Sequence, residues 1–378
     1  MKYIEKLKFN DSLSRRNFLK VATNKGIGTL LGLSVLVDSN CKFNSTEMPN
    51  RVLGRTKLSV SLLGFGCTQV KDKKVYQHAI ELGINYFHMG DRDPTYNLDA
   101  CAALLPYRKK IIIAYMSYPK ASRTQLLDDL DNYLKQSGFG YLDVWFVITP
   151  RPEVLNAFHE AISIAYQAGK IRWSGITTHS LDRDVKILTT QDSKVDVVMM
   201  AYNYLSPPAH SDILGKFHHA NLGITPMKPL AGKFYQRTIN KPDPLLRWLA
   251  DDTRIHTIPV IMNTIEQVDQ NVAAVKLPIS QEDLDVLQTL YVYNSQRYCR
   301  MCGACNGKCP KQLSVSDLVR TAMYSEGYKD IELARSNFLS IPKNNRKISC
   351  ETCDQCLVIC PNGVAIKERI CGVKELLV

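Results

Sequence analysis

The residues best suited to chemistry are eight cysteines in the last quarter of the chain, which repeat one spacing twice. Each block follows the pattern C-x2-C-x2-C-x3-C-P. The first block contains Cys299, Cys302, Cys305 and Cys309, and the second contains Cys350, Cys353, Cys356 and Cys360. Thiolates are ligands for soft metal centres. Two blocks with one shared spacing therefore predict two related metal sites.

Zinc and disulfides are the alternatives to a cluster. Structural zinc usually takes its ligands as two pairs separated by a longer loop, and three cysteines at successive steps of three do not fit that arrangement. A disulfide framework has no need of two identical spacings. The run is the ferredoxin type, in which three closely spaced thiolates hold one 4Fe–4S cube and the fourth cysteine binds the other cluster.

We therefore expect two 4Fe–4S clusters with crossed ligation. One cluster is expected on Cys299, Cys302, Cys305 and Cys360, and the other on Cys350, Cys353, Cys356 and Cys309. Such a protein holds or passes electrons, so a redox partner protein is expected as well. The apolar side chains expected to shield the clusters from water are those of Leu357, Val358, Ile359 and Val364.

The first 45 residues read as an export signal. Residues 14–20 are S-R-R-N-F-L-K and resemble the twin-arginine signal S-R-R-x-F-L-K at every defined position. The apolar stretch at 26–37 has the length of a signal's hydrophobic region and is too short to span a membrane. The alternative interpretation is an amphipathic basic N-terminus with a chance pair of arginines.

The signal and the cysteine blocks both predict a protein that is exported after it has folded around its clusters. The twin-arginine route carries folded proteins, as a protein loaded with clusters in the cytoplasm requires. We expect a periplasmic protein, or one anchored on the outer side of the inner membrane. No A-x-A cleavage site lies near Val37, so an uncleaved membrane-associated segment is one alternative. Lipidation at Cys41 is another, although residues 38–40 make a poor lipobox.

Length and composition set limits on the remaining possibilities. The 378 residues allow two or three domains, or one large barrel with an appendage. The net charge of +12 is spread along the chain without aromatic interleaving, which argues against nucleic-acid binding. An acidic redox partner or an anionic membrane surface is a better use of that charge.

The middle of the chain alternates short apolar runs with amphipathic segments. The predicted strands are 59–65, 84–88, 111–115, 142–148, 171–176, 195–200, 224–229 and 256–261. The predicted helices are 73–82, 97–105, 122–136, 152–168, 181–190, 211–220, 244–250 and 265–275, with 316–324 and 330–337 near the C-terminus. Repeated strand–helix units predict an α/β fold with a parallel (β/α)8 TIM barrel.

The expected domains follow from this alternation. They are the signal region at 1–45, the barrel at 46–292, and a mostly helical ferredoxin-like domain with two 4Fe–4S clusters at 293–378. An open doubly wound sheet is the alternative to the barrel. No G-x-G-x-x-G follows an early strand, so a dinucleotide-binding Rossmann unit is not supported.

Six segments of the barrel region resemble aldo/keto reductases, in the family's order. They are L-G-R-T at 53–56, V-S-L-L-G-F-G at 60–66, A-I-E-L-G-I-N-Y-F at 79–87, G-K-I-R at 169–172, Y-N at 202–203 and M-K-P-L-A-G at 227–232. The resemblance implies a (β/α)8 barrel that uses NADPH to reduce carbonyls. The branch it most resembles carries a C-terminal ferredoxin-like domain.

The resemblance also implies where catalysis would occur. The family uses Asp, Tyr, Lys and His at the C-terminal ends of barrel strands. Here only the tyrosine is retained, as Tyr96, while His88 replaces the aspartate, Met116 the lysine and Ile148 the histidine. Two family positions beside the cofactor are also changed, and they are occupied by Met199 and Val260. These losses argue against ordinary NADPH-dependent carbonyl reduction and leave NADP binding as a possibility.

Tyr96 and His88 are the candidate catalytic residues. His88 is close in sequence to Asp91 and Asp93, and His179 is predicted at the end of the fifth strand. One interpretation is a new acid/base site, or a metal site of imidazole and carboxylate. The other is a histidine that fills the vacated space and is hydrogen-bonded to a carboxylate.

Three functions follow from these observations. The first is an exported oxidoreductase that moves electrons through two 4Fe–4S clusters to or from a small-molecule substrate at the barrel mouth. The second is a catalytically degenerate barrel that serves as an electron-transfer or scaffold subunit of a redox complex. The third is a barrel that still binds NADPH weakly and reduces carbonyls.

Overall fold

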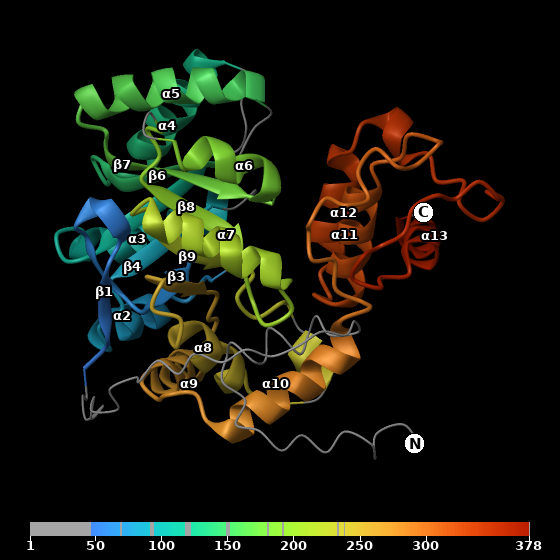
Figure 1. Ribbon diagram of the computed structural model, residues 1–378. Coiled ribbons are helices and arrows are strands. Elements are labelled where there is room, and N and C mark those ends of the chain that lie inside the picture. The colour runs from blue at the N-terminus through green and yellow to red at the C-terminus, as the bar shows by residue number, and fades with distance from the viewer. Residues whose placement is uncertain are drawn as a thin grey trace.

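The computed structural model describes residues 47–377 apart from 69, 91–93, 118–121, 149–151, 180, 191–192, 233 and 238. The twin-arginine motif at 14–20 and Cys41 lie outside the described residues. Figure 1 shows a barrel with a smaller helical module beside it, and α10 (Gln281–Asn294) leads from one to the other. Within the described part of the chain, no helix is long and apolar enough to cross a membrane.

The barrel predicted from the strand–helix alternation is confirmed. Among the described residues, eight parallel strands form one sheet in the order β10-β3-β4-β5-β6-β7-β8-β9. They are β3 (Leu63–Gly66), β4 (Tyr86–Met89), β5 (Ile112–Ser117), β6 (Leu142–Ile148), β7 (Ile171–Thr178), β8 (Val197–Ala201), β9 (Gly223–Met227) and β10 (Ile258–Val260). Parallel strands joined by helices are covered on their outer face, which explains their near-continuous apolar runs.

The barrel closes where β9 meets the residues before β10. The backbone N–H of His256 donates to the carbonyl of Ile224 at 3.0 Å, and the N–H of Ile224 donates to His256 Nδ1 at 2.9 Å. Burial lowers the pKa of His256 to about 4, so the imidazole is neutral and can accept this bond at pH 7. One side chain thus joins the two edge strands.

A hairpin covers the N-terminal end of the barrel. Strands β1 (Asn50–Val52) and β2 (Ser59–Ser61) pair antiparallel and are separate from the large sheet. The buried side chains of Leu53 and Val60 pack into the barrel interior. The single strand predicted over 59–65 is therefore wrong, because the chain leaves the hairpin at Leu62 and enters the barrel as β3. With this end covered, the C-terminal end is left for a site.

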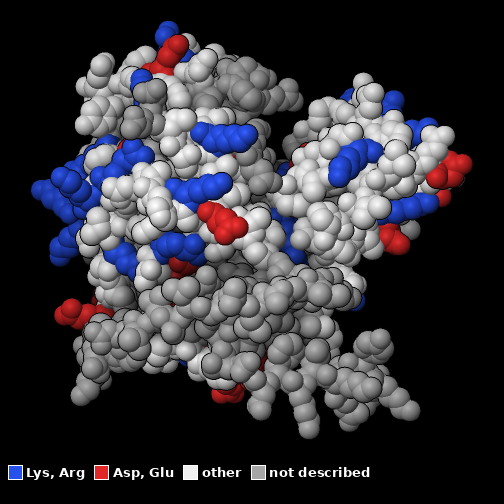
Figure 2. Space-filling view, in the orientation of Figure 1, with Lys and Arg blue, Asp and Glu red and all other residues white. Residues whose placement is uncertain are grey.

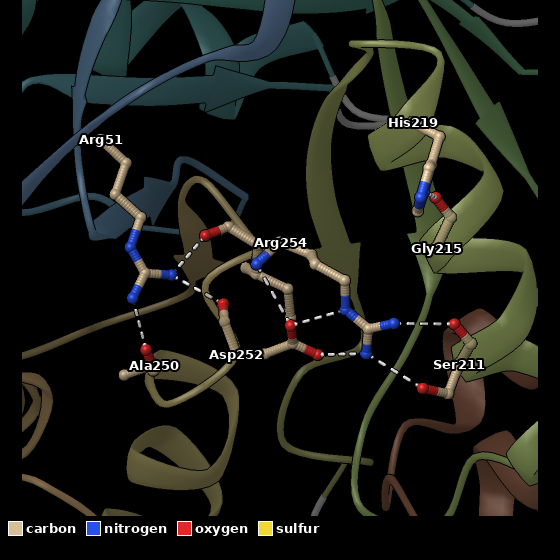
Figure 3. A network of polar contacts seen from close by, with 8 residues as sticks. Arg51, Ser211, Gly215, His219, Ala250, Asp252 and Arg254 are labelled. Carbon is tan, nitrogen blue, oxygen red and sulfur yellow. Dashed lines mark hydrogen bonds and ion pairs between the residues drawn. The ribbon is translucent and has the colours of Figure 1, made fainter. Parts of the chain in front are cut away.

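Two arginines hold the loop between α8 (Asp243–Ala250) and β10 in place (Figure 3). Arg51 of β1 donates to the backbone carbonyls of Ala250 and Asp252. Arg254 donates from Nε and Nη2 to the Asp252 carboxylate, at 2.9 Å in both cases, and also bonds Ser211 of α7 (Pro208–His219). Bidentate guanidinium–carboxylate pairs are among the stronger polar contacts, and this one ties the hairpin end of the barrel together.

The barrel helices lie close to the predicted ones. Besides α7, α8 and α10, they are α2 (Lys73–Glu81), α3 (Pro94–Leu104), α4 (Arg123–Ser137), α5 (Pro152–Gln167), α6 (Leu181–Leu188) and α9 (Ile265–Val275). Short 3-10 helices occur at Gly54–Thr56, Leu105–Tyr107, Phe234–Arg237 and Lys343–Arg346. Helix α10 was not predicted, although Ser280 and Asp283 form a capping box that marks its start.

The C-terminal module is built from α11 (Val315–Glu326), α12 (Ile331–Ser340) and α13 (Ile366–Leu377). Helix α11 packs against both of the others. The buried side chains of Ile366, Ile370 and Val373 on α13 have the spacing of one helix face. The predictions include α11 and α12 but omit α13, for which this spacing is the sequence signal.

The module rests on the C-terminal end of the barrel. Asn203, just after β8, donates from Nδ2 to the hydroxyl of Tyr298 at 2.9 Å. In the loop after β9, the ring of Phe234 packs edge-on against the Tyr298 ring, with centroids 5.6 Å apart. A Cβ added to Gly232 in the same loop would lie 2.1 Å from the Tyr328 ring. The module is therefore seated directly on the loops that follow β8 and β9.

Candidate metal centres and barrel mouth

The structure gathers the eight cysteines around two small cavities in the module. One cavity is lined by Cys299, Cys302, Cys305 and Cys360. The other is lined by Cys309, Cys350, Cys353 and Cys356. Each cavity thus receives three cysteines from one block and the fourth cysteine of the other block, which is the grouping of a crossed pair.

Glycines let the first cysteine block curl around its cavity. Gly303 and Gly307 have φ values of +73° and +71°, in the left-handed region that glycine enters without steric cost. The partly buried side chains of Cys299, Cys305, Cys309, Cys350 and Cys360 pack against the apolar core of the module. That core includes Leu318, Ile341 and Ile370. The thiols therefore line the rim of an apolar core.

The donor set fits two iron–sulfur cubes. Among the described residues, no group of three or more His, Cys, Asp or Glu side chains is arranged to hold a single metal ion. A cube needs a wider arrangement, because each thiolate binds a different iron. Burial raises the pKa of Cys299 to about 12 and that of Cys305 to about 11, so the metal-free thiols are protonated and cluster binding must release protons.

One cluster cysteine already accepts a hydrogen bond from a side chain. Asn362 donates from Nδ2 to Cys302 Sγ at 3.5 Å. Arg300, which is buried, donates to Asn362 Oδ1 at 2.9 Å and to the hydroxyl of Tyr291 at 2.6 Å, and so fixes the amide. Hydrogen bonds to cluster sulfurs shift the reduction potential. Arg300 and Asn362 were not predicted, and their only signal in the sequence is their position next to Cys299 and Pro361.

The expected apolar shield is only half present. Val364 is buried and Val358 packs against the module core, as expected. Leu357 and Ile359, by contrast, are 72% and 79% exposed, so the expectation is wrong for these two. This segment has no helical structure, and side chains two residues apart on an extended chain point to the same side. Leu357 and Ile359 therefore face solvent while Val358 faces inward.

His88 lies inside the barrel among apolar side chains. Its ring packs edge-on against the Phe146 ring, with centroids 5.3 Å apart. A Cβ added to Gly90 would lie 3.7 Å from His88 Nε2 and 2.9 Å from the Cβ of Met116. The Nδ1 atom is buried and has no hydrogen-bond partner among the described residues. Burial lowers the pKa of His88 to about 4, so the imidazole is neutral at pH 7.

The remaining predicted mouth residues are only partly placed. Tyr96 belongs to α3, but its side chain lies outside the described part of the structure, as do Asp91 and Asp93. Its role and that of His88 stay predictions. Ile148 ends β6 and pairs with Thr177, and Met199 is buried inside the barrel. The floor around the substituted positions is therefore largely apolar.

His179 borders a different space. It follows β7 and lines a cavity of about 510 Å³ whose other walls come from the module, including Cys309, Asp317 and Arg320. Its Nε2 atom is buried without a hydrogen-bond partner among the described residues. Burial lowers the pKa of His179, and the nearby charges of Lys228 and Arg320 lower it further. The structure thus places His179 at the junction of barrel and module.

Comparisons with known proteins agree with this architecture. Residues 65–245 match the aldo/keto reductase family, and residues 298–365 match the 4Fe–4S dicluster domain. The aldo-keto reductase from Bacillus halodurans in its holo form is 21% identical and has a TM-score of 0.57, with 65% of this chain and 96% of that chain covered. An aldo-keto reductase from Klebsiella pneumoniae in complex with NADPH is also 21% identical, with 65% and 95% covered and a TM-score of 0.58.

At these identities the solved structures establish the fold of the barrel, and the two family matches establish the order of the parts. The first match lies within the strands and helices of the barrel. The second contains both cysteine blocks in full, from Cys299 to Cys360. The chain therefore carries an aldo/keto reductase domain followed by a 4Fe–4S dicluster domain.

Proposed function

We propose that the protein is an exported iron–sulfur oxidoreductase whose two clusters carry electrons between a redox partner and a substrate at the C-terminal end of the barrel. The two domains together are those of an iron–sulfur oxidoreductase. The proposal that the clusters exchange electrons with a substrate at the barrel mouth rests on one observation. The dicluster module is seated on the loops after β8 and β9, through Asn203, Gly232 and Phe234, and not on the outside of the barrel.

Cysteines and their neighbours in the module supply what two electron-transfer clusters need. We assign one cluster to Cys299, Cys302, Cys305 and Cys360 and the other to Cys309, Cys350, Cys353 and Cys356. When bound, such clusters supply electron transfer at a potential set by burial and by hydrogen bonds to sulfur. Asn362 supplies one such bond, and the apolar core behind the cysteines excludes water.

The partner is proposed to approach the second cysteine block. Cys356 is exposed, and the neighbouring Leu357 and Ile359 present apolar side chains to solvent. In the view of Figure 2, Lys and Arg side chains are scattered over both parts of the molecule, and Asp and Glu side chains are fewer, some of them at the outer edge of the module. The net charge of +12 favours association with an acidic protein. We therefore propose an acidic electron-transfer protein as the partner.

A degenerate barrel is the second candidate function, and the surroundings of His88 favour it. At the family's aspartate and lysine positions the structure has a neutral histidine and Met116, packed with Phe146. Such a pocket offers no charged pair to tune a tyrosine as a general acid. In this version the barrel is a scaffold, and the module passes electrons within a larger complex.

The clusters are tested first. Protein prepared without oxygen is expected to contain about eight irons and eight sulfides per chain, as two cubes require. Reduction by dithionite is expected to bleach the visible absorption and produce a paramagnetic signal for each cluster. An iron content of about four or fewer in protein that is folded by circular dichroism would contradict the assignment of two clusters.

NADPH tests whether the barrel is an ordinary carbonyl reductase. The Klebsiella relative is described in complex with NADPH, so the cofactor is a fair probe for this barrel. We expect no bleaching of the clusters by NADPH and no oxidation of NADPH by added aldehydes, because the family's aspartate and lysine positions hold His88 and Met116. Micromolar NADPH binding followed by hydride transfer to a carbonyl would instead support the ordinary reductase, and it would exclude the scaffold.

A further inference from the structure

The cavity between His179 and the module has the properties of a binding site. Its volume of about 510 Å³ is in the range of small-molecule pockets. Its walls come from both parts of the chain, with His179 from the barrel and Gly303, Ser314, Asp317 and Arg320 from the module. His179 is the one barrel residue in the described lining.

Positive charge gathers at this cavity. Arg320 is largely buried, and its Nη2 donates to Asp317 Oδ1 at 2.6 Å and to Asn337 Oδ1 at 3.2 Å. These bonds fix the guanidinium, while its Nε is buried without a hydrogen-bond partner among the described residues. Lys228 lies outside the lining, but its charge lowers the pKa of His179. Within the described lining Asp317 offsets Arg320, so the positive charge beyond this pair comes from Lys228.

The N-terminus of α11 also favours an anion in this cavity. Ser314 occupies its N-cap position but makes no side-chain capping hydrogen bond within the described structure. Ser314, Ser316 and Asp317 all line the cavity, so the first turn of the helix borders it. A helix N-terminus favours anions through its free N–H groups and its dipole. It therefore adds to the charge of Arg320.

We propose that this cavity binds a small organic anion, held by Arg320 and the first turn of α11 with His179 at the opposite wall. A planar guanidinium matches both carboxylate and phosphate groups, so the shared chemistry is an oxyanion on an organic body. The cavity also touches Cys309, a proposed cluster ligand. This inference rests on the proposed function and deepens it, because it places the substrate where the C-terminal end of the barrel meets the module.

Binding of small probes to the full, cluster-loaded chain tests the site. Benzoate and phenyl phosphate are titrated into the oxidised protein by calorimetry, with benzyl alcohol as the uncharged control. At least one of the two anions is expected to bind saturably, and benzyl alcohol is not. Tighter binding of benzoate identifies a carboxylate site and tighter binding of phenyl phosphate identifies a phosphate site. If neither anion binds, or if benzyl alcohol binds equally well, the proposal is wrong.

Variants locate the bound anion. Arg320→Gln is expected to weaken binding about tenfold or more, because a charge-assisted hydrogen bond is lost. Arg335→Gln is the matched control, since that arginine is half exposed on α12 and pairs only with Glu332 within the described structure. His179→Ala is expected to weaken binding about fivefold, as for one ordinary hydrogen bond. An affinity unchanged by both Arg320→Gln and His179→Ala would overturn the proposed position.

A second variant covers the case in which Arg320→Gln fails to assemble. Asn306 is exposed at the rim of the cavity, and Asn306→Trp would narrow the opening without touching Arg320. This variant is expected to keep the full iron content and to bind the anion at least about tenfold more weakly. Unchanged binding would contradict the site. Binding is measured without electron transfer, so a protein with eight irons and no anion affinity refutes this inference and leaves the proposed function standing.

Discussion

His88 shows how a single substitution changes what a barrel can do. The position would hold an ionised carboxylate in an active reductase, and here it holds an imidazole packed edge-on against Phe146, with both His88 and Met116 next to Gly90. A lone aspartate beside Met116 would be a buried charge without its lysine, which costs several kcal/mol. A neutral histidine avoids that cost. The substitution is therefore compatible with a stable barrel whether or not catalysis persists.

The buried imidazole predicts a pH dependence of barrel stability. The folded-state pKa of His88, about 4, lies below its usual value of 6.5, so the unfolded chain binds more protons between these limits. Stability is full above about pH 6.5 and falls as the pH drops towards 4. At about pH 5.5, His88 is expected to account for a loss on the order of 1 kcal/mol, which His88→Met should remove.

The measurement is urea unfolding of wild type, His88→Met and the exposed-site control His219→Met at about pH 7.5 and pH 5.5. All three tryptophans, Trp145, Trp173 and Trp248, lie in the barrel, so their fluorescence follows barrel unfolding apart from cluster loss. The buried His256 adds a similar acid-sensitive contribution, which the variant leaves in place. If His88→Met loses as much stability as wild type at pH 5.5, His88 has the same pKa in the folded and unfolded chain, and the buried neutral imidazole is excluded.

Crossed ligation is a second prediction for individual residues. Replacing Cys299, Cys302 and Cys305 with serine is expected to remove one cluster and leave about four irons. The surviving cluster should still need Cys309, because that thiol lines the second cavity. Adding Cys309→Ser should therefore reduce the iron content further, whereas adding Cys360→Ser should not. The reverse result would show that each block binds its own cluster.

At the scale of elements, the barrel can be predicted from the sequence because each strand is marked by its own short apolar run. Parallel strands covered by helices must be apolar, and eight such runs stand between amphipathic segments. The split of the first predicted strand at Leu62 depends on the hairpin packing under the barrel, a long-range contact with no local signature. The cysteine sets could be predicted because ligand spacing is local too.

The junction between the domains could not be predicted in this way. Tyr298 and Tyr328 belong to no motif, and the segment that ends at Gly232 gives no sign of a contact with the module. Only the docking of the module brings these residues together. The same holds for Arg320 and His179, which are far apart along the chain and line one cavity. His179 was expected at the end of a strand, but its neighbours from α11 had no sequence signal.

The loop after β9 makes a testable prediction for the docking of the module. Gly232→Val is expected to push the Tyr328 ring away, because even a Cβ would lie 2.1 Å from it. Gly169→Val is the matched control, since both glycines have a φ of +67° but no other atom lies within 4 Å of a Cβ at Gly169. Both substitutions therefore put a β-branched residue at the same positive φ, and the clash with Tyr328 occurs only at Gly232.

We expect Gly232→Val to increase the radius of gyration in small-angle scattering and to expose the junction to proteases, with the iron content unchanged. Gly169→Val should share the loss of thermal stability that comes from a β-branched residue at positive φ, yet keep the compact shape. If the two variants scatter alike, the module is held by contacts other than this loop.

At the scale of the whole molecule, the proposed export signal and the clusters depend on each other. A route for folded proteins suits a chain whose cysteines must meet iron and sulfide before they leave the cytoplasm. Residues 14–20 lie outside the described structure, so the proposal rests on their sequence alone. It predicts that location follows both the arginine pair and the state of the clusters.

Replacing Arg15 and Arg16 with lysine keeps the charge of the signal and removes the guanidinium pair, so the protein is expected to stay in the cytoplasm of a bacterium that has the route. Lys6→Arg with Lys8→Arg is the control, because it makes two conservative changes outside the motif. Cell fractionation followed by iron analysis of each fraction gives the answer. Export of the double-lysine variant at the wild-type level would exclude the twin-arginine route.

Export of a cluster-free variant distinguishes the twin-arginine route from a route that exports unfolded chains. With all eight cluster cysteines replaced by serine, the module loses its metal ligands, and metal binding of this kind is coupled to folding. A route that accepts only folded proteins should then retain the variant even though its signal is intact, whereas a route for unfolded chains should export it. Retention of the variant, together with export of the loaded wild type, would link the N-terminal signal to the C-terminal cysteines.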